Sequence, residues 1–166
     1  MLKNVLVPLD FSKLSEMALP YAVEVTEDDG RITLLVAIEP VENVPSFPPG
    51  EFLNRINTDS AKKEMFQRAE THMKRVISNL PRPKAEIEYV VEFGTAADVI
   101  LDFAKNSNID LIVMSTHGRT GFNRWWMGSV THKVLSAAPC PVIVVPGTNH
   151  VNETVTVEQT SVAAGE

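Results

Sequence analysis

The chain has 166 residues, with 15 Lys and Arg against 21 Asp and Glu, so its formal net charge is −6 at pH 7. This length suits one domain with a substantial core, and the acidic balance gives no electrostatic basis for binding nucleic acid. No apolar run reaches the length of a membrane helix, so we expect no insertion into a membrane.

Cysteine usage and the amino terminus bear on the compartment. Cys140 is the single cysteine, which excludes an internal disulfide and fits a reducing environment. The first residues lack the apolar region of a signal peptide before Asp10. We therefore predict a cytoplasmic protein.

The first part of the chain predicts two strands joined by a helix. Residues 5–9 and 32–38 are short apolar runs typical of buried strands. Between them lies an amphipathic stretch whose start Ser12 or Ser15 can cap. Pro20 falls inside this predicted helix and is expected to bend it or to leave one carbonyl unpaired.

The middle of the chain continues the alternation after an irregular loop. Residues 39–50 contain four prolines and predict an exposed loop. Apolar residues then recur on one face between Ala61 and Leu80, which predicts the clearest helix of the chain. Residues 87–93 predict a third strand, and residues 96–106 a further helix.

The last part of the chain reads as strand, glycine-bearing loop, helix and strand, which is a βαβ unit. The strands are residues 111–114 and 142–145, the loop covers residues 115–121, and the helical pattern begins after Gly128-Ser129. Five nearly continuous apolar strands alternating with helices predict an α/β fold, a single open parallel sheet with helices on both faces. Residues 147–166 show no helical period, so we predict a domain over residues 1–146 followed by a flexible tail.

The opening of the last predicted helix suggests an anion site. The first turn of a helix has backbone N–H groups without partners and a partly positive end, and Gly128 leaves room for a phosphate to reach them. Ser129 and Thr131 would add hydroxyl donors. The alternative is a connector that merely turns the chain, and spacing alone does not decide between the two.

Four stretches together form a more specific pattern. Three are VPLDFS at residues 7–12, GTAA at residues 94–97 and APCPV at residues 138–142. The fourth is STHG at residues 115–118, followed by nine residues and then Gly128-Ser129. In this combination the chain resembles the universal stress protein family over residues 1–146. The resemblance implies an adenine nucleotide alpha hydrolase-like sheet of strand order 3-2-1-4-5.

The resemblance also implies a ligand, ATP together with Mg²⁺, across the carboxyl ends of the first and fourth strands. Pro8 and Asp10 would lie beside the adenosine, and the Ala37 backbone would meet the adenine edge. The alternative for Asp10 is a solvated residue at the strand end or a local cap. The residues expected around the ribose and phosphates are Met114, Ser115, His117, Gly118, Gly128, Ser129, Val130 and Thr131. No catalytic residue and no protein-bound metal is predicted.

Ser115 departs from the family pattern, in which this position is glycine. If the position needs a positive φ or a bare backbone against the ligand, serine weakens binding. If it needs only a small side chain, serine is tolerated, and this is what we expect.

Three functions follow from these observations. The first is a stress-response or signalling module that binds ATP and reports its occupancy to a regulatory protein partner. The second is a protein-interaction module that binds no nucleotide, which the departure at Ser115 favours. The third, an ATP-using enzyme, ranks last because the chain lacks a GK[ST] loop and a readable nucleophile–base pair, so any ATP hydrolysis should be slow.

The last strand is the predicted site of self-association. The resemblance implies a homodimer that pairs residues 142–145 of two copies. An apolar strand at a sheet edge would otherwise stay exposed.

Overall fold

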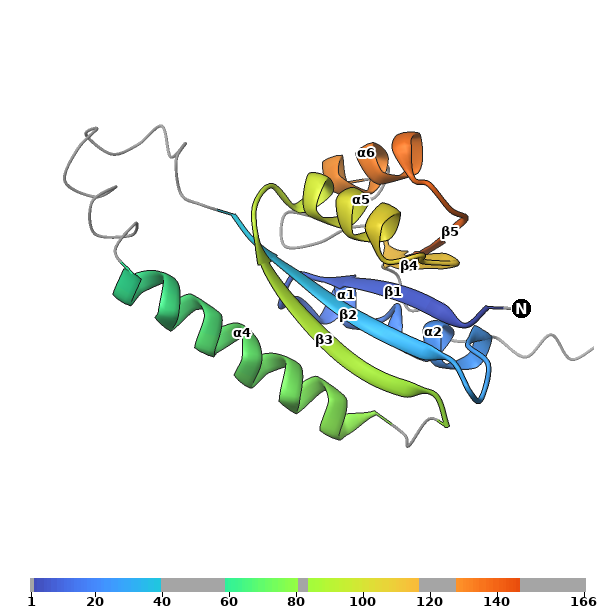
Figure 1. Ribbon diagram of the computed structural model, residues 1–166, viewed down its shortest axis with the longest axis horizontal. Helices are drawn as coiled ribbons and strands as arrows, with labels where there is room; N and C mark the ends of the chain where they lie inside the picture. The colour runs from blue at the N-terminus through green and yellow to red at the C-terminus, as the bar shows by residue number, and fades with distance from the viewer. Residues whose placement is uncertain (1, 40–58, 81–83, 117–127, 147–166) are drawn as a thin grey trace, which may run out of the picture.

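A computed structural model describes residues 2–39, 59–80, 84–116 and 128–146. Its five strands form one parallel sheet of order β3-β2-β1-β4-β5, which confirms the predicted fold class and order (Figure 1). The strands are β1 (Asn4–Leu9), β2 (Arg31–Ile38), β3 (Glu86–Phe93), β4 (Leu111–Ser115) and β5 (Val142–Val145). The helices are α1 (Lys13–Glu16), α2 (Leu19–Val25), α4 (Asp59–Asn79), α5 (Ala96–Asn106) and α6 (Ser129–Ala137).

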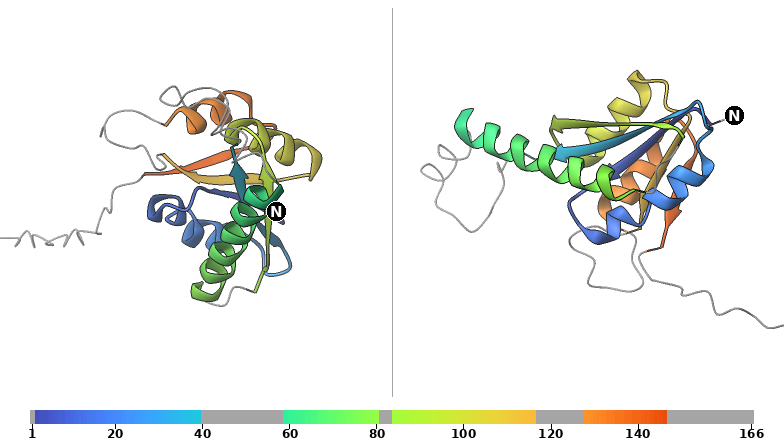
Figure 2. Two further views of the ribbon diagram at one scale, coloured as in Figure 1. Left: turned by 90° about the vertical axis from the view of Figure 1, so that its left-hand side faces the viewer. Right: turned by 90° about the horizontal axis from the view of Figure 1, so that it is seen from below.

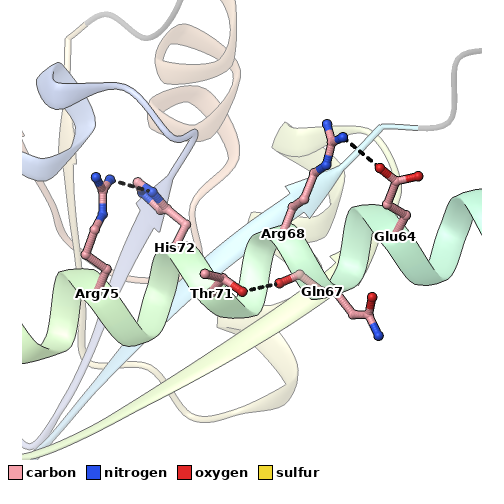
Figure 3. Close-up of a pocket in the computed structure, with 6 residues that line it drawn as sticks. All are labelled: Glu64, Gln67, Arg68, Thr71, His72 and Arg75. Atoms are coloured by element: carbon pink, nitrogen blue, oxygen red, sulfur yellow. Dashed lines mark hydrogen bonds and ion pairs between the residues drawn. The ribbon is translucent and has the colours of Figure 1, made fainter.

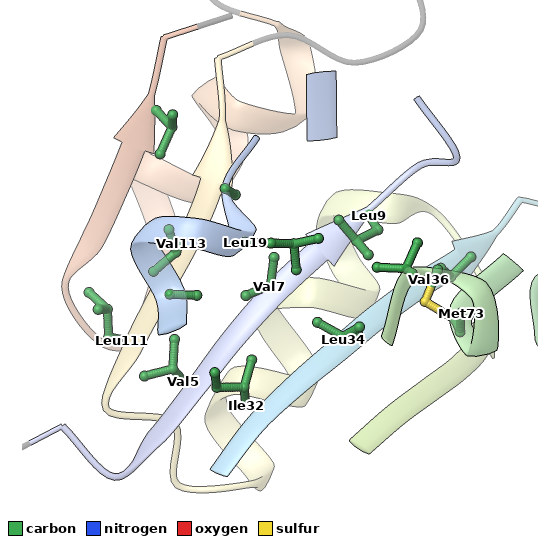
Figure 4. Close-up of a cluster of buried hydrophobic side chains, with 14 of the residues drawn as sticks. Val5, Val7, Leu9, Leu19, Ile32, Leu34, Val36, Met73, Leu111 and Val113 are labelled. Atoms are coloured by element: carbon green, nitrogen blue, oxygen red, sulfur yellow. The ribbon is translucent and has the colours of Figure 1, made fainter. Parts of the chain in front are cut away.

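Helices cover both faces of this sheet, as its apolar strands require. Helices α1, α2 and α4 lie on one side, and α5 and α6 on the other (Figure 2). Because side chains alternate along a strand, Val5 and Val7 belong to the first layer while Leu6 between them belongs to the second. Figure 4 shows the first layer, in which Met73 of α4 packs with strand residues such as Val36.

The prediction of a single helix after the first strand is wrong in one respect, because the structure has two helices there. Helix α1 ends at Glu16, and α2 begins at Leu19. Pro20 is the second residue of α2. A proline has no N–H and its ring clashes with the carbonyl four residues earlier, here that of Glu16. The regular helical hydrogen bonding therefore stops between Glu16 and Leu19, although Met17 and Ala18 keep helical φ and ψ values.

Helix α4 matches its prediction closely. Ala69, Met73 and Val76 are buried against the sheet, as the amphipathic pattern indicated. The hydroxyl of Tyr89 on the edge strand β3 donates to Glu70 Oε1 at 2.9 Å and ties the helix to that strand.

Some expectations fall outside the described residues. These are the exposed character of most of the proline-rich loop, the roles of His117 and Gly118, and the tail at residues 147–166. Within the described ranges, no helix combines the length and the apolar character needed to cross a bilayer.

Candidate functional site

A cleft of ≈ 750 Å³ opens at the carboxyl ends of β1, β2 and β4. Strand β1 lies between β2 and β4, so the chain order reverses at this point of the sheet, where open α/β folds bind their ligands. The volume lies in the range of small-molecule sites. The predicted residues that line the cleft are Pro8, Asp10, Ala37, Met114, Ser115, Gly128, Ser129, Val130 and Thr131.

The amino-terminal end of α6 faces this cleft. Gly128 is its N-cap residue and has no side chain with which to cap the helix. No acidic residue lies in the first turn. The backbone amides of Ser129, Val130 and Thr131 open a helix in which the first regular bond joins His132 N–H to the Gly128 carbonyl at 2.9 Å. This end of α6 therefore keeps its positive partial charge.

Two hydrogen bonds fix the end of α6 against the end of β4. The Gly128 amide donates to the Thr116 carbonyl at 2.9 Å, and the buried Thr131 hydroxyl donates to the Ser115 carbonyl at 3.1 Å. The hydroxyl proton of Thr131 is thus used inside the protein. Of the two hydroxyls predicted as donors to a ligand, the exposed Ser129 hydroxyl is the one placed at the surface of the cleft.

Asp10 lies across the cleft, directly after β1. Its Oδ1 accepts from the Ser12 amide at 3.0 Å and from the Ser12 hydroxyl at 2.6 Å. Its own amide donates to the buried Ser15 hydroxyl at 3.3 Å, and Phe11 beside it adopts a left-handed φ of 69°. Asp10 therefore holds Ser12, the N-cap residue of α1, in a local turn, and it also lines the cleft.

Ser115 is the last residue of β4 and is buried. Among the described non-glycine residues, positive φ occurs at Phe11 and Asn108 and not at Ser115. The backbone at this position is ordinary extended strand, which any residue adopts. Serine therefore brings no backbone strain where the family pattern has glycine.

The structure adds cleft residues that the sequence analysis did not select, among them Glu39, Met65 and Arg68. Glu39 Oε1 accepts from the Ala96 amide at 3.0 Å, so it caps α5 from the end of β2. Met65 and Arg68 come from α4, and Arg68 forms an ion pair with Glu64 at 2.6 Å. Glu64 and Arg68 are one helical turn apart. Local sequence carries no signal for the contact between Glu39 and Ala96, nor for the place of α4 residues in the cleft, because these join segments far apart in the chain.

A second, shallower hollow of ≈ 450 Å³ runs along α4 (Figure 3). It is lined by Glu64, Gln67, Arg68, Thr71, His72 and Arg75. Its charged groups pair with one another: Arg68 with Glu64, and Arg75 with His72 Nδ1 at 3.0 Å. Burial, and then the nearby Arg75, lowers the pKa of His72, so its ring is neutral at pH 7. The Arg75 guanidinium also lies 4.0 Å from Glu16 Oε1, so each arginine of this hollow has a carboxylate nearby, and the cleft at the strand ends is the better candidate.

The comparisons with known proteins agree with this geometry. The model of the universal stress protein family matches residues 1–146. The chain belongs to the universal stress protein family. Among its relatives, the universal stress protein MJ0531 of Methanocaldococcus jannaschii is 30% identical over 146 residues, which are 86% of this chain and 81% of the relative. YxiE of Bacillus subtilis is 29% identical and covers 87% of this chain and 99% of its own length.

Solved structures of the family share the fold. The structure of MJ0577, also from Methanocaldococcus jannaschii, is 27% identical with a TM-score of 0.73 over 90% of this chain and 99% of its own. A universal stress protein in complex with cAMP has a TM-score of 0.60 at 17% identity and covers 89% of this chain and 98% of its own. An Arabidopsis thaliana member with AMP bound has a TM-score of 0.51 at 18% identity over 89% of this chain and 93% of its own.

Proposed function

We propose that this chain is an ATP-binding stress-response or signalling module, whose occupancy by nucleotide changes its contacts with a regulatory protein partner. The observation that carries the proposal is the amino-terminal end of α6, which begins at Gly128, has no acidic residue in its first turn and lines a cleft of suitable size together with Asp10. The first turn of a helix binds phosphate through backbone amides that have no partner within the helix.

The cleft is polarised in a way that suits a nucleotide. Carboxylates, those of Asp10 and Glu39, follow β1 and β2, and the positive end of α6 lies beside β4. Carboxylates accept hydrogen bonds from hydroxyl and amino groups, such as those of a ribose or an adenine. The phosphates would then lie on the amides of Ser129, Val130 and Thr131, and the nucleoside toward β1 and β2.

Relatives support a nucleotide as the ligand class. The cAMP complex and the AMP-bound Arabidopsis thaliana protein both carry adenine nucleotides on this fold. ATP for this chain follows from the family resemblance of its 115–129 motif.

A Mg²⁺ ion would enter this site with the nucleotide. Among the residues that the structure describes, no group of three or more His, Cys, Asp and Glu could hold a metal. The ATP phosphates and water would therefore supply most of its ligands, as is usual for Mg²⁺. We propose no catalytic residue, and any hydrolysis of ATP should be slow.

Equilibrium dialysis of the purified chain with ATP, AMP and adenosine tests the proposal. Saturable binding of ATP and AMP, weaker binding of adenosine and competition by inorganic phosphate are expected. Gly128→Val places a branched side chain at the mouth of α6 and should abolish nucleotide binding.

A matched pair of serine variants tests the position of the phosphates. Ser129→Ala removes a hydroxyl at the first turn of α6, whereas Ser136→Ala removes one near the end of the same helix, outside the cleft. One hydrogen bond contributes about 1 kcal/mol, so Ser129→Ala should weaken ATP binding roughly fivefold and Ser136→Ala should leave it unchanged. If the wild-type chain shows no saturable nucleotide binding, the protein-interaction module without a nucleotide is the better assignment.

Self-association through β5 is a further part of the proposal. Strand β5 is at the edge of the sheet, and Val142, Ile143 and Val144 are only half-buried. An open apolar edge favours pairing with a second copy. Sedimentation at concentrations well above micromolar should give the mass of a dimer, and a monomer there would refute this arrangement.

A further inference from the structure

Two helices, α5 and α6, begin near the carboxyl ends of the strands, where the cleft lies, and their first turns differ in charge. At α5, Glu39 Oε1 accepts from the Ala96 amide at 3.0 Å, and Asp98 lies within the first turn. At α6, the N-cap residue Gly128 has no side chain, and the first turn has no acidic residue. Ala96 and Glu39 line the same cleft as Ser129.

A carboxylate at the start of a helix does what a bound phosphate would do. It takes an amide donor and offsets the positive end of the helix dipole. A phosphate that approached α5 would find the Ala96 amide occupied and would meet the like charge of Glu39. At α6 it would meet the first-turn amides, which have no partner within the helix, and no acidic residue in that turn.

Glu39 and Ala96 both line the cleft, so the hydrogen bond between them is part of its wall. Glu39 follows the last residue of β2 directly, and the neighbouring Ile38 carbonyl accepts from the Gly94 amide at 3.0 Å. The ends of β2 and β3 and the start of α5 are thus joined at one corner. The guanidinium of Arg68, which also lines the cleft, is engaged by Glu64 at 2.6 Å.

We propose that Glu39 is a specificity-determining residue, which closes the α5 end of the cleft to phosphate and so gives a bound nucleotide a single orientation. The uncharged nucleoside then lies near β2 and α5, and the phosphates lie on α6. This inference rests on the proposed nucleotide-binding function and adds to it a reason for the direction of binding.

Backbone amide NMR of the full chain, titrated with inorganic phosphate and then with AMP, tests the inference. In the wild-type chain, the amide signals of Ser129, Val130 and Thr131 should move and those of Ala96 and Ala97 should not. Glu39→Ala frees the α5 amides, so in this variant the Ala96 and Ala97 signals should also move with phosphate. Each variant is compared with itself before phosphate is added.

Two further variants separate charge from hydrogen bonding. Glu39→Gln keeps an oxygen acceptor for the Ala96 amide but removes the charge, and it should strengthen phosphate binding roughly twofold to fivefold, the range of one charge at a helix end. Asp102→Asn removes the same charge from the exposed face of α5 outside the cleft and should change nothing. A local loss of structure would not produce this dependence on charge.

The outcomes are distinguishable. If the α6 amides respond to AMP but the α5 amides already respond in the wild-type chain, or stay silent in Glu39→Ala, the role of Glu39 is refuted and the nucleotide site stands. If no α6 amide responds to AMP or phosphate, the proposed function fails and the role of Glu39 fails with it.

Discussion

Ser15 holds the loop that carries Asp10, and its removal gives a sharp test of the site architecture. Ser15 is 4% exposed, and its hydroxyl donates to the Ser12 carbonyl at 2.9 Å and accepts from the Asp10 amide at 3.3 Å. Two hydrogen bonds of about 1 kcal/mol each are lost in Ser15→Ala. The higher helix propensity of alanine offsets about 0.5 kcal/mol, so the free energy of unfolding should fall by about 1.5 kcal/mol.

Thermal unfolding measures this loss. For a chain of this size, about 1.5 kcal/mol corresponds to a decrease in Tm of roughly 3–6 °C. Ser136→Ala is the matched control, because Ser136 is exposed and its hydroxyl donates to the His132 carbonyl of its own helix, at 2.9 Å. If Ser15→Ala unfolds within 1 °C of this control, Ser15 does not anchor the loop. If it is destabilised as expected but binds ATP as tightly as the wild-type chain, the loop does not position Asp10 for the ligand.

Three other predictions concern single residues. Gly94→Ala should lower the free energy of unfolding by about 1–3 kcal/mol, because φ at this position is 154° and a Cβ would lie 2.8 Å from Val99 Cγ2. In a Val99→Ala background the contact is relieved but the strained φ is not, so thermal unfolding should show only part of this loss. Hydrogen bonds from the backbone amides of Asn4 and Lys3 hold the pKa of Asp110 below its ordinary value of 3.8, so the wild-type chain should lose stability as the pH falls below about 4. The Asp110→Asn variant should be less stable than the wild type at pH 7 and should lose less stability in acid. Urea unfolding at each pH measures both effects. Burial and then the charge of Asp110 raise the pKa of the Cys140 thiol, so iodoacetamide should modify the folded chain at pH 7 far more slowly than the urea-unfolded chain, and equal rates by mass spectrometry would contradict this.

The sheet was predictable because each of its strands is a short apolar run in the sequence. Residues 5–9 and 32–38 are buried on both faces, and such strands have nearly continuous hydrophobic sequence. Their order came from the family resemblance, since local pattern does not say which strands are neighbours. The stretch between the first two strands was predicted less well. Its apolar spacing suggested one helix, but Pro20 ends the regular helical hydrogen bonding, and the structure has α1 and α2 there.

The cleft was predictable to the extent that its residues belong to motifs. Asp10 and Gly128 stand at the ends of elements that the sequence shows, so their meeting at the carboxyl edge follows from a parallel sheet. Glu39 looked like the first residue of a proline-rich loop, and Arg68 looked like part of a solvated helix face. Their places in the cleft depend on how β2, α4 and α5 pack, which no local pattern encodes.

Because all strands of the sheet run in the same direction, its two ends differ, and this decides where a fluorescent label would report ligand binding. Asp110 Oδ2 accepts from the amides of Lys3 and Asn4, each at 2.9 Å, at the edge opposite the cleft. The Val145 carbonyl accepts from the Thr116 amide at 2.9 Å, next to Ser115 in the cleft wall. Strand β1 is six residues long, about 20 Å at the usual rise. A fluorophore on Lys3 would thus lie far from the cleft, whereas one at position 146, which follows the strand end that bonds Thr116, would lie nearer to a bound ligand and should report its binding.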